Sequence, residues 1–597
     1  GGPNGLINVK MLRNAEMHTG AFPASRPNAL SSVLELYQRE GRTDKFGGNF
    51  TLGATDWGFL LEGPMGKKSS YMISARESFS QHMLKALGVP VLPTYADVQY
   101  KQVFHFDQKN ELTLTGIGSY DKFELNIDAD PTESLLYNVG YIPEGKQFMY
   151  AGGAVYKHYL DNSYYTIVLS RNYLNGTAQK FLDNDEETGD QILDYQSIEA
   201  ENKFRIEHKI MRDDIEWEYG VNLEHDQVLT QNASIYTDRQ ANSEFLAYDT
   251  EFQMLRYGLY GSYAHRFFED ELDFFAGIRL DGNTYNAEMQ NPLKQFSPRL
   301  ALTWHATNQW NFNASAGIYY QLPPYVVMAY GEGKDLVNQD RLKYMRSSQA
   351  GLGVDFNTKE GYQFKVEGFY KKYEDYPFLL LDSISLANAN ANYVLVGNQP
   401  ADASSDGRAY GVEFQVKQKY HKSYYWMLTY TFVVSQFADV DGSYVSSSWD
   451  NRHIASVALG KTFGKNWQVG IRWSFTGGNP YTPYDIERSS LQSVWDLNRR
   501  GLLDYSRLNE ARLPVFHALD VRVDKQFNFK KWTLACFLDL QNAYMSPIAA
   551  LPYLTVEREG ETGAPITDPN DPTRYLTKII SSDTGRLIPS LGVLIDF

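Results

Sequence analysis

Several features are scarce or missing in this chain of 597 residues. A single cysteine, Cys536, excludes a disulfide framework and a metal site built from several cysteines. No run of about eighteen or more apolar residues occurs, which excludes membrane-spanning helices. Positive charge is in the minority, with 56 Lys and Arg against 72 Asp and Glu and a formal net charge of −16. This balance argues against a nucleic-acid partner.

Enzymatic motifs are also missing. The sequence has no Gly-x-Ser-x-Gly elbow, no His-Glu-x-x-His and no phosphate-binding loop. Its 11 histidines are scattered singly, and none stands in a pattern that pairs a nucleophile with a base. We therefore predict no catalytic residues, no metal centre and no enzymatic activity.

Aromatic residues are abundant, at 14% of the chain, and hydropathy alternates along many segments. In residues 467–475, Trp467, Val469 and Ile471 fall on one face, whereas Gln468 and Arg472 fall on the other. A period of two residues predicts strands with one apolar and one polar face. The hydrophobic fraction of 43% argues against disorder.

Short polar turns, such as 107–110 and 464–466, alternate with longer irregular loops, which predicts that all short turns lie at one end of the molecule. Counting from residue 45, we predict 22 strands, among them 271–288, 407–421 and 531–546. The predicted fold class is an all-β, 22-stranded antiparallel transmembrane β-barrel. A lumen of that width needs a plug because side chains alone do not fill it.

The alternative is a soluble all-β protein such as a sandwich. Three features favour the barrel: strands of ten or more residues, aromatic residues such as Tyr319 and Trp426 near strand ends, and a final alternating strand that stops on Phe597. We interpret Phe597 as a signal for membrane assembly. Cys536 shares a face with Leu534 and Leu538, so we expect it to face lipid as an inert thiol.

Residues 1–44 do not form a predicted pair of barrel strands, and they hold no signal peptide. Since an outer-membrane protein must be exported, we expect the N-terminus to be mature, processed or truncated. Several segments resemble one known family, the TonB-dependent outer-membrane receptors. Leu12-Arg-Asn-Ala-Glu-Met-His-Thr-Gly-Ala-Phe-Pro-Ala-Ser-Arg26 and 28–36 resemble the end of the plug domain, 61–70 and 74–79 the first barrel hairpin, and 538–544 and 588–597 the last two strands. The subgroup that carries a carboxypeptidase-regulatory-like N-terminal domain is the most similar. Pro27 departs from it, because a glycine is common there.

This resemblance implies two domains: the C-terminal end of a plug with its linker over 1–44, and a transmembrane barrel over 45–597. It places the protein in the outer membrane of a Gram-negative cell. The implied partners are the lipid bilayer, the barrel-assembly machinery, the TonB complex where an upstream plug is present, and a surface lipoprotein or other outer-membrane subunits.

The resemblance also implies a receptor that binds a scarce ligand (a chelated metal, a glycan or a peptide) and imports it with energy derived from TonB. The alternative is a plug-poor barrel that serves as a structural subunit of a larger outer-membrane complex. A passive porin ranks last, because a large open pore endangers the envelope.

Aromatic side chains in predicted outer loops are the candidate ligand-binding residues, because they offer flat apolar faces with a polar tip. The alternative is that they pack loop on loop and close the mouth. The candidates are Tyr325, Tyr330, Tyr481, Tyr484 and Trp495.

An acidic run with Asp183, Asp185 and Asp190 offers oxygen atoms that calcium accepts as ligands. It lacks the spacing and the glycine of an EF-hand loop, so a solvated outer loop is the favoured interpretation and no cofactor is predicted.

Overall fold

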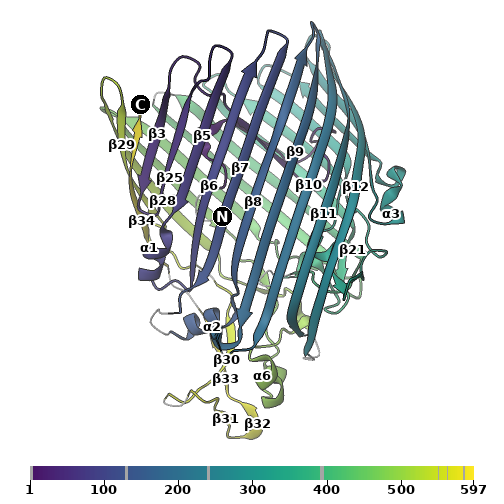
Figure 1. Ribbon diagram of the computed structural model, residues 1–597, viewed down its shortest axis with the longest axis vertical. Coiled ribbons are helices and arrows are strands. Elements are labelled where there is room, and N and C mark those ends of the chain that lie inside the picture. Colours follow the sequence, from purple (N-terminus) through teal and green to yellow (C-terminus); the bar gives the residue numbers. More distant parts are fainter. Residues whose placement is uncertain are drawn as a thin grey trace.

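The computed structural model describes residues 5–127, 132–187, 189–237, 243–389, 396–421, 423–548, 550–560, 563–581 and 585–597. They form a closed antiparallel barrel (Figure 1). The strands are β3 (Gly47–Gly53), β4 (Asp56–Pro64), β5 (Ser69–Ser78), β6 (Val91–His105), β7 (Asn110–Leu125), β8 (Glu144–Tyr159), β9 (Ser163–Phe181), β10 (Gln191–Arg212), β11 (Ile215–Thr237), β12 (Ser243–Phe267), β13 (Leu272–Asn283), β14 (Ser297–His305), β15 (Trp310–Gln321), β18 (Met345–Asn357), β19 (Tyr362–Leu379), β21 (Ala401–His421), β22 (Tyr424–Ala438), β24 (Arg452–Phe463), β25 (Trp467–Thr476), β28 (Phe516–Asn528), β29 (Thr533–Gln541) and β34 (Ile588–Asp596).

The predicted barrel of 22 strands is confirmed, and only some strand ends differ. β13 ends at Asn283 rather than 288, because Asn286 caps the short helix α3 (Ala287–Gln290). β29 ends at Gln541 rather than 546, because Asn542 takes a left-handed backbone conformation with φ 50°. β21 begins at Ala401 rather than 407, since its early residues still pair with β19.

The barrel closes between its first and last strands. β3 pairs with β34 from Asn49 opposite Asp596 to Gly53 opposite Gly592. Beyond the last pair, the Phe597 N–H donates to the Gly48 carbonyl at 3.0 Å, and the Gly48 N–H donates to the Phe597 carbonyl at 3.1 Å. The C-terminal aromatic residue therefore completes the seam, while its role as an assembly signal stays a prediction.

Short turns and long loops lie at opposite ends, as predicted (Figure 1). At the long-loop end, the connection between β3 and β4 has only two residues. The long loops hold the remaining elements: α1 (Ser80–Ala86), α2 (Glu133–Tyr141), η2 (Leu182–Asn184), η3 (Pro292–Gln295), α4 (Tyr325–Met328), β16 (Gly331–Glu332), β17 (Asp335–Leu336), β20 (Ile384–Ser385), η4 (Leu386–Asn388), β23 (Tyr444–Ser446), β26 (Pro480–Tyr481), α5 (Ile486–Ser489), α6 (Gln492–Asn498), η5 (Tyr505–Arg507), β27 (Ala511–Arg512), β30 (Tyr553–Val556), β31 (Thr567–Asp568), β32 (Asp571–Tyr575) and β33 (Thr577–Ile580).

The outer wall carries an apolar band between two belts of aromatic side chains. On β11, Tyr219 and Leu223 are exposed on the outside, whereas Asn222 and Asp226 are buried toward the lumen. One belt lies near the short turns and includes Tyr165, Trp217, Tyr263, Trp304, Trp310, Phe312, Phe364, Trp467 and Phe527. The other, toward the long loops, includes Tyr120, Phe148, Tyr150, Tyr173, Tyr370 and Tyr410. Tyr319 belongs to neither, because it faces the lumen and is 1% exposed.

Within the described residues, no helix is long and apolar enough to cross a membrane.

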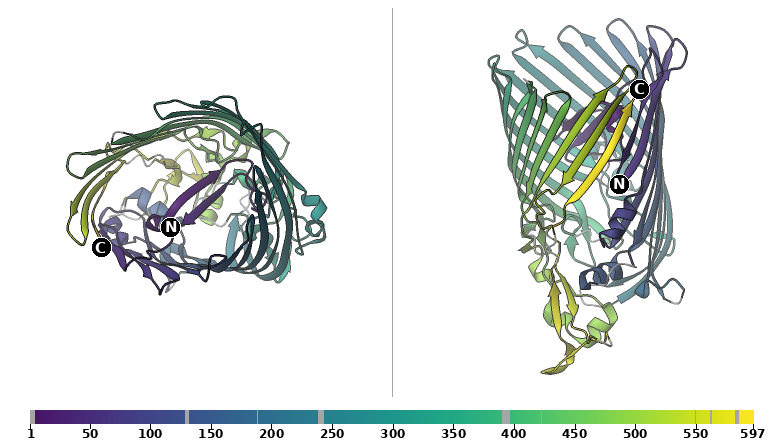
Figure 2. Two further views of the ribbon diagram at one scale, coloured as in Figure 1. Left: turned by 90° about the horizontal axis from the view of Figure 1, so that it is seen from above. Right: turned by 90° about the vertical axis from the view of Figure 1, so that its left-hand side faces the viewer.

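Residues 5–44, which we call the lumen segment, lie inside the barrel (Figure 2). The segment contains η1 (Val9–Met11) and a hairpin of β1 (Leu12–His18) and β2 (Val33–Gln38), which pair antiparallel. The first four residues of the predicted plug remnant lie outside the described residues. The two-domain division stays a prediction.

Candidate functional site in the barrel lumen

The loop of the lumen segment between β1 and β2 is held by cations of the barrel wall. Arg299 on β14 is 3% exposed and its Nη1 donates to the carbonyls of Phe22 at 2.9 Å and Pro23 at 2.5 Å. Its guanidinium also lies over the rings of Phe22 and Tyr319, at 4.7 and 4.9 Å from the centroids. Charge-assisted hydrogen bonds and two ring faces therefore fix this part of the segment.

Neighbouring strands add further donors to the same loop. Arg279 on β13 donates from Nη1 to the Ala24 carbonyl at 3.0 Å, and Asp281 holds its guanidinium in place at 2.6 Å. Lys371 on β19 donates from Nζ to the Thr19 carbonyl at 3.1 Å and to Ser31 Oγ at 2.8 Å. Most acceptors are main-chain carbonyls, so the wall recognises the backbone path of the loop more than its side chains.

The beginning of the segment is tied to the opposite side of the lumen. Arg76 on β5, which pairs with Asp97, donates to the carbonyl of Leu6 at 2.7 Å. Lys10 donates to Asn49 Oδ1 at 2.7 Å and to Thr51 Oγ1 at 2.8 Å. Burial lowers the pKa of Lys10 to about 8.

The linker that leads from β2 into the barrel is anchored near the seam. Arg39 forms a two-pronged ion pair with Glu62 on β4, at 2.5 and 2.8 Å, and the Arg42 N–H donates to the same carboxylate at 3.1 Å. Glu40 lies beside His105, 3.2 Å from its Nε2, while Glu111 lies 3.5 Å from its Nδ1.

Glu40, His105 and Glu111 are the one group of three potential metal ligands found within the described residues. Sequence reasoning missed it, because Glu40 is brought to the β6–β7 hairpin only by the path of the linker.

An ion pair inside the segment links its loop to β2. Arg26 donates from Nε to Glu35 Oε1 at 2.6 Å and from Nη2 to Oε2 at 3.0 Å, and the Tyr37 hydroxyl donates to Oε2 at 2.6 Å. Burial alone would raise the pKa of Glu35, but the hydrogen bonds from Arg26 and Tyr37 outweigh it and lower that pKa below its usual value.

Replacing Glu35 with glutamine is expected to loosen the hairpin, since Arg26 and Tyr37 lose their charged acceptor. Amide exchange over 33–38 should rise about fivefold, which corresponds to about 1 kcal/mol. Because the pKa of Glu35 is lower in the folded chain, this stabilisation is present above the usual carboxyl pKa of 4.5 and is lost as the pH falls through the folded pKa. Hydrogen exchange at pH 6 and pH 3 checks this; equal protection of both chains at pH 6 would contradict it.

The loop between β15 and β18 folds into the mouth of the barrel. Leu322, Val327 and Met328 belong to a buried apolar cluster with Phe252 and Met254 of the wall. The Tyr325 hydroxyl donates to Glu201 Oε1 at 2.8 Å and to Asp226 Oδ2 at 3.2 Å. Tyr330 is 2% exposed and lies edge-on to Tyr248, with ring centroids 5.5 Å apart.

The other predicted tyrosines lie in loops beyond the rim. Tyr484 is half-buried beside Gly501 and is hydrogen-bonded to Tyr137 of α2, which stacks on Tyr553 with centroids 4.3 Å apart. Burial raises the pKa of Tyr484 and of Tyr137. Three long loops thus meet in one aromatic cluster.

Of the remaining candidates, Trp495 in α6 is 2% exposed, and Tyr481 in β26 is half-buried. The burial of Trp495 and Tyr330 favours the alternative that these residues pack loop on loop. Ligand binding by the five aromatic residues stays a prediction.

The acidic loop does not gather its carboxylates. Asp183 lies 3.3 Å from Arg499, and the Asp185 side chain accepts from the Glu187 N–H at 2.9 Å. Asp183, Asp185 and Asp190 do not form a group of ligand atoms in the described part of the chain. The arrangement favours a solvated loop, because Asp183 and Asp185 contact different neighbours.

Comparisons with known proteins agree with the architecture. The family model for the TonB dependent receptor-like β-barrel matches residues 32–542. The siderophore receptor PirA from Acinetobacter baumannii superimposes with a TM-score of 0.68 at 12% identity, over 99% of this chain and 86% of that one. The copper transporter OprC superimposes with a TM-score of 0.65 at 12% identity, over 98% and 86% of the two chains.

A mutant of the ferric enterobactin receptor PfeA from Pseudomonas aeruginosa gives a TM-score of 0.68 at 11% identity, over 99% of this chain and 86% of that one. Comparison with curated proteins gives no significant match. At these identities the solved structures establish the fold, while the family model covers most of the chain. This chain belongs to the TonB-dependent receptors, and it is an outer-membrane β-barrel receptor or transporter of that family.

Proposed function

We propose that this receptor captures a scarce ligand at its outer loops and imports it through the lumen when TonB-derived force moves the lumen segment. The observation that carries the proposal is the way the segment is held. Hydrogen bonds join it to β3–β7 on one side and to β13–β19 and the loop after β15 on the other. These contacts are polar and separate, so they can be broken one after another without disturbing the barrel.

The rest of the wall supports a path for the ligand. Among the described residues, no hydrogen bond of the lumen segment goes to β21–β29. The lumen face there is polar and charged: Arg522 lies 2.9 Å from Asp524 and 3.9 Å from Asp539, and Arg472 also faces inward. Movement of the segment would widen a passage along this wall, lined by groups that a hydrated ligand can contact.

The ligand class is open between a chelated metal, a glycan and a peptide. A siderophore receptor and a copper transporter share the fold. At 12% sequence identity, however, a shared fold does not indicate a shared ligand.

Deleting the receptor should slow growth under one limiting condition and leave the others unchanged. Cells are compared with and without it under iron limitation, with glycans as the carbon source, and with peptides as the nitrogen source. The condition under which growth slows identifies the ligand class. Loss of TonB should cause the same growth defect under that condition. Normal growth in all three arms, together with altered outer-membrane complexes, would replace the proposal with the structural-subunit alternative.

A further inference from the structure

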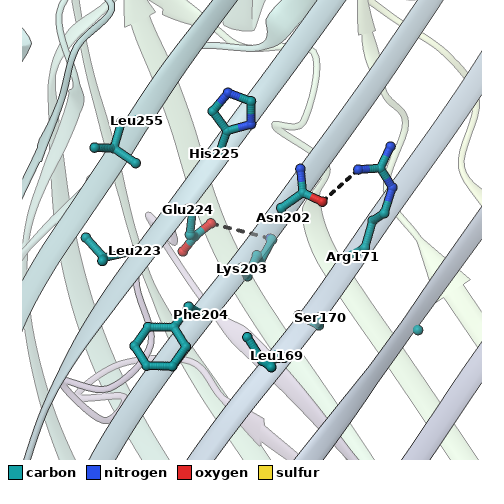
Figure 3. Close-up of a pocket in the computed structure, with 11 residues that line it drawn as sticks. Leu169, Ser170, Arg171, Asn202, Lys203, Phe204, Leu223, Glu224, His225 and Leu255 are labelled. Carbon is teal, nitrogen blue, oxygen red and sulfur yellow. Dashed lines mark hydrogen bonds and ion pairs between the residues drawn. The ribbon is translucent and has the colours of Figure 1, made fainter.

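The outer wall of the barrel has a depression across β8–β12, and Figure 3 shows the residues that line it. It lies at the limit of the apolar band on the long-loop side. Along β9, outward positions are apolar up to Leu169 and then continue with Arg171, and along β11 they are apolar up to Leu223 and then continue with His225. The depression is lined by Gly152, Leu169, Ser170, Arg171, Asn202, Lys203, Phe204, Leu223, Glu224, His225 and Leu255.

Strand register explains its shape. Gly152, Arg171, Asn202, His225 and Leu255 stand directly opposite one another on five successive strands, so they form one transverse row on the outer face. The next residue in that row, on β7, is also a glycine. The two missing side chains leave open space beside the Arg171 side chain.

Arg171 is exposed on this face and is held by two neutral groups. Its Nε donates to the Tyr150 hydroxyl at 3.0 Å, and its Nη1 donates to Asn202 Oδ1 at 2.6 Å. Among the described residues, no carboxylate lies within ion-pair distance of it. Lys203 and Glu224, also visible in Figure 3, are the alternate, lumen-side residues of their strands and lie 3.6 Å apart.

On the side toward the short turns, the depression has an apolar floor. Leu169 is 57% exposed, and Phe204 and Leu223 are exposed beside it. Arg171 is thus a fixed cation with no counter-charge among the described residues, and it lies next to exposed apolar side chains at the edge of the membrane band. This combination matches a molecule with an anionic head and a hydrocarbon tail.

We propose that this depression binds a phosphorylated lipid of the outer leaflet, with a headgroup phosphate on the Arg171 guanidinium and an acyl chain along Leu169, Phe204 and Leu223. Arg171 differs in this respect from an ordinary interfacial cation, whose charge is solvated by water or paired with a carboxylate. On neighbouring β7, the outward Lys122 is already neutralised by Glu124, at 2.5 Å.

The test is native mass spectrometry of the chain in detergent micelles, titrated with bisphosphorylated lipid A, with dephosphorylated lipid A and with inorganic phosphate. We expect one or more phosphorylated lipids to be retained, with about tenfold weaker binding in Arg171→Gln, which loses the charged donor. Gly152→Leu keeps the charge but fills the depression. Its added Cβ would meet only the Thr115 carbonyl at 3.6 Å, an ordinary contact, so the barrel should accept it.

Lys122→Gln serves as the matched control and should bind like the unaltered chain. Equal binding of the dephosphorylated lipid, or equal binding by Arg171→Gln, would overturn the proposal. Displacement of the lipid by inorganic phosphate at similar concentration would also overturn it, since the acyl floor would then contribute nothing. A dimer that Gly152→Leu converts to a monomer, without any change in lipid retention, would assign the surface to a second copy of this chain instead.

Discussion

Replacing Arg299 with alanine is expected to release the central loop of the lumen segment while the barrel stays closed. The change removes charged donors from the carbonyls of the buried Phe22 and the half-buried Pro23, and it takes the cation away from two aromatic rings. Leaving such groups without a partner costs about 3 kcal/mol in total. Amide exchange over 19–31 should therefore rise about a hundredfold, whereas exchange in the barrel strands should not change.

Hydrogen exchange followed by mass spectrometry measures both regions in one experiment. Arg472→Ala is the matched control, because Arg472 also faces the lumen but has no hydrogen bond to the segment among the described residues. Heat-dependent mobility on a denaturing gel reports whether the barrel itself has folded. Unchanged protection of 19–31 in a folded Arg299→Ala chain would show that Arg299 does not hold the segment.

A disulfide between the segment and the wall is expected to stop import completely and reversibly. A Cβ placed on Gly20 would lie 3.8 Å from Ser315 Oγ on β15, which brings the pair Gly20→Cys and Ser315→Cys close to the spacing that a disulfide needs. Cys536 is the sole native cysteine and is replaced by alanine. If the ligand passes only when the lumen segment moves, oxidised cells should fail to grow under the limiting condition in which growth requires the receptor. Adding a reductant should restore growth.

Two controls separate this effect from damage to the barrel. Ser456→Cys with Ser474→Cys joins two strands that are already paired opposite each other on β24 and β25, so it should leave import intact. Each single-cysteine chain should also grow normally in oxidant. Growth of the cross-linked chain at the normal rate would mean that the segment does not have to move, and the import mechanism would be wrong.

The strand alternation in the sequence was enough to predict the barrel, because a period of two residues depends only on local backbone geometry. It gave the number of strands and the positions of the turns. It failed at strand ends such as Asn283 and Gln541, where a capping side chain or a left-handed residue stops the strand. Such strand ends depend on the backbone conformation or capping side chain of a single residue, and the hydropathy pattern does not report either.

The lumen site was not predictable in the same way. In the sequence, Arg299 and Lys371 look like any other polar residue on the lumen face of a strand. Phe22, which Arg299 contacts, lies 277 positions away in the chain, and Thr19, which Lys371 contacts, lies 352 positions away. The aromatic loop residues were chosen for their chemistry, and the structure shows Tyr325 bonded to carboxylates of the wall. No local sequence pattern distinguishes an aromatic side chain that binds a ligand from one that packs against other loops and closes the mouth of the barrel.

The sequence by itself determined the class of fold, the strand count, the apolar outer face and the resemblance to the TonB-dependent receptors, since all of these follow from short-range patterns. Only the tertiary structure decided which cations hold the lumen segment and how the long loops close the mouth. It also placed Arg171 beside two glycines and, among the described residues, beyond ion-pair distance of any carboxylate. These features arise when strands come into register around a closed barrel, and register is set by the whole sheet rather than by any one segment.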